Sequence, residues 1–175
     1  PPVLWIDGIK MQEGNPIKRA EEKVRWARGR VLDICTGLGY TAIAAAKRAG
    51  EVVTIERDEN VLLLAAHNPW SKELFENPRI RIIVGDAFEV VRRLSAPFDF
   101  IIHDPPRFSL AGELYSLAFY RELLRLLKPK CFLYHYTGSP RGGRLRRGIE
   151  KRLREAGFEV AGRDEYGILL LKPNS

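Results

Sequence analysis

The sequence predicts an α/β fold in which helices cover both faces of a mostly parallel β-sheet. Three observations lead to this fold class. Short runs of β-branched and other apolar residues alternate with helix-like segments along most of the chain, an order typical of parallel sheets. The first run leads through a glycine-rich turn into a helix-like segment, and the last two runs have the pattern of a hairpin. With 175 residues, 45% of them hydrophobic, the chain can form one domain with a substantial core.

The individual elements follow from these runs and from the residues that end them. Gly50 and Gly157 each follow a helix-like segment, where glycine readily adopts the left-handed conformation of a helix end. Pro129 ends the helix before it, and the polar residues 162–165 separate the two strands of the terminal hairpin. The expected strands are 31–34, 51–56, 80–84, 98–103, 131–136, 158–161 and 166–171. The expected helices are 41–49, 59–67, 87–94, 117–127 and 143–156.

Residues 31–175 are predicted to form one domain, preceded by residues 1–30 as an N-terminal extension. Because the chain begins with Pro1 and Pro2 rather than Met, the extension is open to interpretation as the remnant of an upstream domain. No apolar run reaches the roughly 20 residues that cross a bilayer, so we expect no membrane association. The two cysteines, Cys35 and Cys131, lack the paired spacing of a zinc site, which favours a cytoplasmic protein without a metal.

The chain carries a net charge of +7, which leaves two interpretations open. A basic surface attracts polyanions such as RNA or DNA, but abundant Glu, Lys and Arg with few labile residues also fit a protein from a hot environment. The densest positive cluster lies in and before the helix 143–156, and is either a phosphate track or a solvated helix paired with Glu150 and Glu155. It comprises Arg141, Arg144, Arg146, Arg147, Lys151, Arg152 and Arg154.

Glycines and acidic residues follow the first two strands, whose carboxyl ends meet along one edge of a parallel sheet. Gly37 and Gly39 allow the backbone after the first strand to approach a ligand closely. Asp33, at the end of that strand, can pair with a ligand ammonium group. Glu56, the last residue of the second strand, can accept both hydroxyls of a ribose. The loop lacks the third glycine of pyrophosphate binders, which disfavours a nicotinamide-dependent oxidoreductase.

The turn after the third strand adds three candidate ligand-binding residues. Asp86 can take an adenine amino group, and Ala87 can offer its backbone N–H to the ring. Phe88 can pack on the adenine face or belong to the core. Together these turns predict a site for an adenosyl ligand.

Four segments resemble motifs I to IV of class I S-adenosylmethionine-dependent methyltransferases: VLDICTGLGYTAI, VVTIERDENVLLLA, IRIIVGDAFEV and FDFIIHDPPRF. More narrowly, the chain is similar to a group of archaeal predicted methyltransferases with spermine-synthase-like relatives. The resemblance implies a Rossmann-like three-layer sandwich whose mostly parallel seven-stranded sheet has an antiparallel last strand. It also implies S-adenosylmethionine as cofactor and S-adenosylhomocysteine as product. The expected cofactor-binding residues are Asp33, Cys35, Thr36, Gly37, Gly39, Glu56, Arg57, Asp86, Ala87, Phe88 and Asp104.

One position of the first motif departs from the family. Its usual first glycine is Cys35 here, and Thr36 follows. We therefore expect the methionine end of the cofactor to sit differently, with Thr36 as a candidate contact for its carboxylate. Cys35 is expected to pack as a small apolar residue rather than to act in catalysis.

The segment after the fourth strand predicts an acceptor site. Pro105 and Pro106 stiffen the loop and lack backbone donors, which leaves the Asp104 carboxylate and nearby carbonyls as rigid acceptors for an amino group. Methyl transfer then needs mainly in-line positioning. Arg107 can bind a phosphate or carboxylate of the substrate. We expect these four residues to be the catalytic group.

The same segment resembles the [DN]PP[YFW] signature of enzymes that methylate exocyclic amino groups of bases, except that Arg107 replaces the aromatic residue. Phe108 could supply the stacking instead. The segment also looks like the DPP[KR] loops of enzymes that methylate pyrimidine C5, but the nucleophilic cysteine of that chemistry is missing. The other expected substrate-binding residues are Tyr115, His135 and Tyr136.

The sequence thus favours a methyltransferase acting on an amino group, with RNA as the preferred substrate class. One alternative is a polyamine-type aminopropyltransferase that uses decarboxylated S-adenosylmethionine and a small-molecule amine. Arg107 beside Asp104 and the positive net charge speak against a polycationic substrate. The other alternative is a non-catalytic subunit that binds the cofactor.

Overall fold

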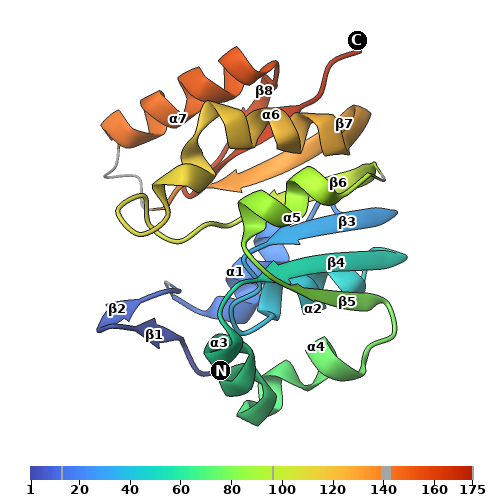
Figure 1. Cartoon of the computed structure of the whole chain (residues 1–175), viewed down its shortest axis with the longest axis vertical. Coiled ribbons are helices and arrows are strands. Elements are labelled where there is room, and N and C mark those ends of the chain that lie inside the picture. The colour runs from blue at the N-terminus through green and yellow to red at the C-terminus, as the bar shows by residue number, and fades with distance from the viewer. Residues whose placement is uncertain (13, 96, 139–142, 175) are drawn as a thin grey trace.

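A computed structural model describes residues 1–12, 14–95, 97–138 and 143–174. The centre of the molecule is a seven-stranded sheet of order β5-β4-β3-β6-β7-β9-β8, whose strands follow one another from β8 at the top to β5 at the bottom of Figure 1. The strands β5, β4, β3, β6 and β7 are parallel, whereas β9 runs antiparallel to both β7 and β8. The bounds are β3 (Arg30–Ile34), β4 (Glu51–Glu56), β5 (Ile80–Val84), β6 (Phe98–His103), β7 (Leu127–Tyr136), β8 (Glu159–Arg163) and β9 (Gly167–Leu171). The predicted α/β sandwich and its reversed last strand are confirmed.

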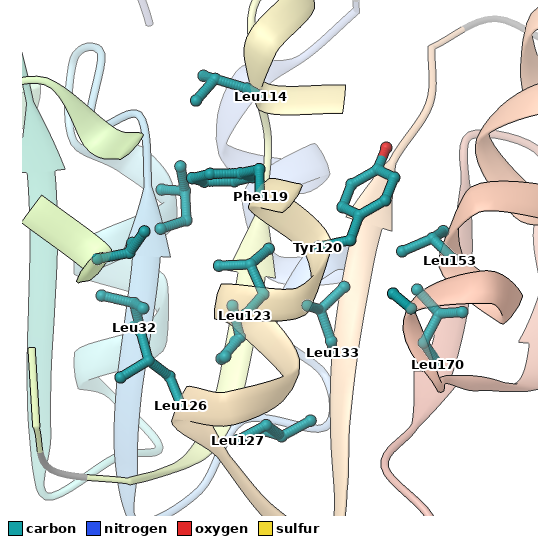
Figure 2. Packing of buried hydrophobic residues seen from close by; sticks show 14 of the residues in the cluster. Leu32, Leu114, Phe119, Tyr120, Leu123, Leu126, Leu127, Leu133, Leu153 and Leu170 are labelled. Carbon is teal, nitrogen blue, oxygen red and sulfur yellow. The ribbon is translucent and has the colours of Figure 1, made fainter. Parts of the chain in front are cut away.

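Helices cover both faces of the sheet because its central strands are apolar on both sides. Leu32 and Ile34 of β3 belong to the core beneath one helical layer, and Val31 belongs to the core on the opposite face, as the two-residue repeat of a strand requires. Figure 2 shows the first core, in which α6 lies over β3 and β7. That layer contains α5 (Ala87–Arg93), α6 (Leu117–Leu126) and α7 (Gly143–Ala156). The other contains α1 (Pro16–Lys23), α2 (Tyr40–Ala46), α3 (Glu59–His67) and α4 (Lys72–Glu76).

Several boundaries differ from the sequence-based expectation, and those of β7 and β8 follow from how the strands pair. The strand β7 begins at Leu127, which was expected as the last residue of a helix, because Leu127 is buried and pairs with Phe98. The register then shifts before Phe132, and Lys130 in between adopts a φ of 60°. This irregular start accommodates Pro129, which cannot donate to a ladder. At the other end, β8 extends to Arg163, which pairs with Ile168.

Residues 1–30 contain structure that the sequence did not reveal. The short strands β1 (Trp5–Ile6) and β2 (Ile9–Lys10) form a hairpin. Helix α1 follows and buries Ala20 and Val24 in the same core as the alanines of α2. Two short 3-10 helices, η1 (Pro69–Ser71) and η2 (Gly112–Tyr115), complete the elements. None of the helices in the described ranges is long and apolar enough to cross a membrane.

Candidate cofactor and acceptor site

A cavity of about 790 Å³ lies at the carboxyl ends of β3, β4, β5 and β6. All four loops that the sequence analysis singled out contribute to its wall. Fifteen of the eighteen expected site residues line it: Cys35, Thr36, Gly37, Gly39, Glu56, Arg57, Asp86, Ala87, Asp104, Pro105, Pro106, Arg107, Phe108, Tyr115 and Tyr136. The remaining three, Asp33, Phe88 and His135, are absent from the wall.

The loop after β3 carries three left-handed residues, Cys35, Gly37 and Gly39, with φ values of 71°, 55° and 83°. At Gly39 a Cβ atom would lie 2.6 Å from Leu74 Cδ2, so this glycine allows α2 to approach α4. At Gly37 the nearest atom to such a Cβ, Gln12 Nε2, is 3.9 Å away. The positive φ, rather than a lack of space, therefore favours glycine at this position. Cys35 occupies a conformation that normally favours glycine, which explains why related loops carry glycine there.

Glu56 is fixed at the end of β4 by two backbone donors. The N–H of Gly37 donates to Oε2 at 2.9 Å, and the N–H of Asp58 donates to Oε1 at 3.0 Å. A carboxylate accepts about four hydrogen bonds in all. Glu56 therefore retains acceptor capacity toward the cavity while its orientation is set by the glycine loop.

Asp33 does not face the cavity, which corrects its expected role as a direct ligand. The strand β3 continues through Ile34, so Asp33 lies within the sheet rather than at its end and is fully buried. It accepts a hydrogen bond of 2.7 Å from Thr54 Oγ1, which lies 2.6 Å from Thr36 Oγ1. Because Thr54 donates its single proton to Asp33, Thr36 must donate to Thr54, so its hydroxyl cannot donate to a ligand carboxylate.

The environment of Asp33 also changes its ionisation. Burial raises the pKa of this carboxyl to about 7, although the hydrogen bond from Thr54 opposes the shift. Its Oδ1 atom has no hydrogen-bond partner among the described residues. Asp33 therefore supports the glycine loop from behind, through Thr54 and Thr36.

The turn after β5 places two of its three expected residues on the cavity. Asp86 caps α5, with its Oδ1 accepting from the N–H of Glu89 at 3.2 Å. Ala87 is the first residue of α5, where the N–H has no intrahelical acceptor. Phe88 points into the core instead, with its ring centroid 5.5 Å from that of Phe119. Of the two places expected for Phe88, the adenine face and the core, the structure supports the core, since α5 turns this side chain toward α6.

The loop after β6 is braced by an aromatic side chain and a lysine. The hydroxyl of Tyr115 donates to the carbonyl of Pro106 at 2.7 Å, so one lone pair of that carbonyl is already engaged. The ring of Phe108 packs edge-on against Tyr115 at 5.4 Å and is half-exposed. Asp104 Oδ2 lies 2.5 Å from Nζ of Lys23.

His135 lies outside the cavity because the strand alternates. It is fully buried on β7, accepts from Tyr120 and donates to the carbonyl of Tyr136, whereas Tyr136 lines the cavity. His103 is also fully buried and donates to the carbonyl of Leu114 at 2.7 Å. Burial lowers the pKa of both imidazoles, that of His103 to about 4. Neutral, enclosed imidazoles of this kind support the packing behind the acceptor loop.

Residues 1–30 contribute to the cavity, although the sequence led to no expectation of this. Leu4, Lys10, Met11, Arg19 and Lys23 are among the residues of this segment that line the cavity. The Asn-Pro start of α1 is a recognisable helix signal: the Asn15 side chain accepts from two N–H groups and Pro16 occupies the first turn. No local pattern indicates that this helix meets a loop 81 residues further along the chain.

The basic helix α7 begins beside the cavity, where Leu145 contributes to the wall. Lys151 and Arg154 pair with Glu155 and Glu150 at 3.9 and 3.1 Å. Within the described part of the chain, Arg144 and Arg147 are exposed and make no ion pair. Two other residues of the positive cluster donate hydrogen bonds to backbone carbonyls. Arg152 donates to the carbonyl of Tyr115, and Arg146 donates to the carbonyls of Asp164 and Gly167. Arg141 lies outside the described residues.

A seven-stranded sheet with a reversed last strand, and four strand-end loops around one cavity, define a class I methyltransferase fold. The family described as "Methyltransferase domain" matches residues 31–130, and the chain belongs to this family. Family and fold together imply binding of S-adenosylmethionine.

The chain is also similar to individual proteins and to a solved structure. The chain is 48% identical over 187 residues to "Uncharacterized protein MJ1233" of Methanocaldococcus jannaschii, covering 99% of this chain and 65% of that protein. It is 38% identical over 91 residues to a tRNA1(Val) (adenine(37)-N6)-methyltransferase of Citrobacter koseri, covering 48% of this chain and 35% of that enzyme. A structure of spermidine synthase in complex with the transition-state analogue AdoDATO superposes with a TM-score of 0.84 at 20% identity, covering 98% of this chain and 66% of the synthase.

Proposed function

We propose that the chain is an S-adenosylmethionine-dependent methyltransferase that modifies an amino group, with RNA as its substrate class. The observation that carries this proposal is the shared cavity: the glycine loop, Glu56, Asp86 and the Asp104 loop all line one hollow. A cofactor bound along the first three loops would lie next to the fourth. The chain spans 65% and 35% of the length of the two relatives named above. The activity of the whole protein is therefore also a proposal.

The donors and acceptors of the wall fit the cofactor. Glu56 is oriented by Gly37 and Asp58 and can accept from ribose hydroxyls. Asp86 uses Oδ1 to cap α5, which leaves Oδ2 for an adenine amino group, and Ala87 can donate to the ring. Cys35, Thr36 and Arg57 contribute further wall to the same region. Asp33 acts indirectly, by holding the loop in place.

The acceptor loop can orient an amino group. Asp104 has one oxygen engaged by Lys23, and Oδ1 can accept a hydrogen bond from the substrate nitrogen. The cofactor, when bound, supplies a methyl group activated by its sulfonium charge. Asp104 Oδ1 would hold the substrate nitrogen in line with that methyl group and would accept the proton that the nitrogen gives up on methylation. Pro105 and Pro106, with Tyr115 behind them, keep Asp104 in place, and positioning of this kind supplies much of the rate.

Charge near the cavity supports RNA over a small cation. Arg107 is exposed on the acceptor loop, and Arg144 and Arg147 lie at the start of α7 on either side of the cavity residue Leu145. Positive side chains around a site attract phosphates. The half-exposed Phe108 offers a face on which an extruded base could stack.

Aminopropyl transfer remains the second candidate, because the superposition with spermidine synthase covers nearly the whole chain. At 20% identity that likeness concerns the fold alone. A cationic amine would meet Arg107 and Lys23 next to Asp104. We therefore rank it below methyl transfer.

Paired variants test the proposal. Isothermal titration should show S-adenosylhomocysteine binding that weakens at least about tenfold in Glu56→Ala. Glu59→Ala is the matched control, since Glu59 is exposed and absent from the cavity wall. Asp104→Ala should retain that binding but lose transfer of labelled methyl groups into RNA. Equal binding by Glu56→Ala and the parent chain, or full methyl transfer by Asp104→Ala, would contradict the assignment.

A further inference from the structure

Helix α1 delivers a lysine to the acceptor carboxylate. The ammonium of Lys23 lies 2.5 Å from Asp104 Oδ2 and 4.2 Å from the centroid of the Tyr136 ring. The Lys23 side chain is only 11% exposed. A carboxylate and an aromatic face together form a site suited to an ammonium group, and in this chain the protein's own ammonium occupies it.

Lys23 is held there by the packing of its helix rather than by the ion pair alone. Ala20 and Val24, on either side of it in sequence, are 2% and 1% exposed in the core shared with α2. The start of the helix is capped by Asn15. A partly buried lysine on a packed helix has little freedom to leave the carboxylate.

This arrangement has a consequence for the substrate. A cationic alkylamine that approached Asp104 would meet a like charge and would compete with Lys23 for the same oxygen. A neutral aromatic amino group, such as that of a nucleobase, carries no charge and needs only one acceptor lone pair. Asp104 Oδ1 can supply that lone pair while Oδ2 stays with Lys23.

We propose that Lys23 is a specificity-determining residue, which neutralises the acceptor carboxylate and so excludes alkylammonium substrates in favour of neutral amino groups. This inference rests on the proposed function, because it takes Asp104 as the acceptor group. It names the class of amine that the site selects and the residue that selects it.

The test measures amine binding. Putrescine and spermidine are titrated separately into the chain saturated with S-adenosylhomocysteine, using the parent chain, Lys23→Met, Lys23→Arg and Lys18→Met. Lys18 is exposed on the same helix and absent from the cavity wall, so its variant controls for lost charge. Lys23→Met should bind the amines at least about tenfold more tightly than the parent chain. Lys23→Arg and Lys18→Met should bind them like the parent chain, and adding Asp104→Asn to Lys23→Met should abolish the gain.

Each outcome decides the inference. Equal amine affinity of the parent chain and Lys23→Met, whether tight or undetectable, overturns it, since a lysine with only a structural role would alter stability and not amine selectivity. The proposed function fails separately, by absent S-adenosylhomocysteine binding in the parent chain or by absent methyl transfer to RNA. A gain of amine binding in Lys23→Met without methyl transfer would support the inference on Lys23 while removing RNA as the substrate.

Discussion

Single residues in and behind the cavity wall carry conformational or electrostatic costs. Cys35 adopts a φ of 71° although it has a Cβ atom. Asp33 is buried with one oxygen that has no partner among the residues the structure describes, and His103 is buried with a lowered pKa. Costs of this kind gather at functional sites because the surrounding structure imposes them.

The left-handed conformation of Cys35 leads to a prediction. Replacing Cys35 with Gly removes strain of about 1 kcal/mol but adds a similar entropy cost in the unfolded chain. Cys35→Gly should therefore leave the free energy of unfolding within about 1 kcal/mol of the parent chain. Cys35→Val should destabilise clearly, because a β-branched residue rarely adopts positive φ. Urea unfolding measures both, with Cys131→Val, at a position whose φ is not positive, as the control. Equal stability of the Gly and Val variants would contradict the prediction.

Burial of His103 predicts a loss of stability in acid. The unfolded chain binds a proton at this residue near pH 6.5, whereas the folded chain does so only near pH 4 because burial lowers the pKa. Stability should therefore fall as the pH drops from 6.5 to 4, by roughly 3 kcal/mol from this group. His103→Gln, which can still donate to Leu114, should flatten that part of the pH profile. His67→Gln, at an exposed position, should leave it unchanged, and parallel profiles for all three proteins would refute the assignment.

At the scale of elements, the strands were predictable and the packing partners of the helices were not. The ranges of β4, β5, β6, α3 and α7 agree with the sequence-based expectation residue for residue, because apolar runs and terminating glycines act locally. Helix α1 went unnoticed, since its eight residues contain a run of charges. The buried face of α1 consists of small residues. Their place in the core becomes evident only when α1 is seen to pack against α2.

The cap of α1 leads to a prediction about that element. The Asn15 side chain accepts from the N–H groups of Ile17 and Lys18 at 3.1 and 3.3 Å. Asn15→Ala should lower the free energy of unfolding by about 1 kcal/mol, while Asn15→Asp should retain the stability because it keeps the acceptor. Chemical denaturation of the two variants measures the difference. If both destabilise equally, the cap does not hold the helix.

For the whole molecule, the net charge of +7 and its distribution determine how a polyanion would bind. The start of α7 lies beside the cavity, and Figure 1 shows this helix on the side of the sheet opposite to α2. Lys47 and Arg48, at the end of α2, are equally exposed but stand near the start of β4, away from the strand ends that build the cavity.

Charge removal at these two places should have different effects. Arg144→Ala with Arg147→Ala should weaken RNA binding several-fold and reduce the dependence of affinity on salt. Lys47→Ala with Arg48→Ala removes the same charge and should change RNA affinity little. Filter binding of tRNA over a range of salt concentrations distinguishes them. Identical losses for both pairs would mean that net charge, and not the face beside the cavity, governs the affinity.

The sequence by itself determined the fold class, the order of the main elements and the four loops of the cavity, because strand periodicity, glycine conformation and proline stiffness are local properties. Only the tertiary structure decided that Asp33, Phe88 and His135 turn away from the cavity and that Lys23 reaches Asp104. Successive side chains of a strand face opposite sides of the sheet. A shift of one residue in the end of a strand therefore changes which side chain faces the cavity. A contact between a helix and a loop 81 residues apart depends on how complete layers pack, and no local pattern encodes it.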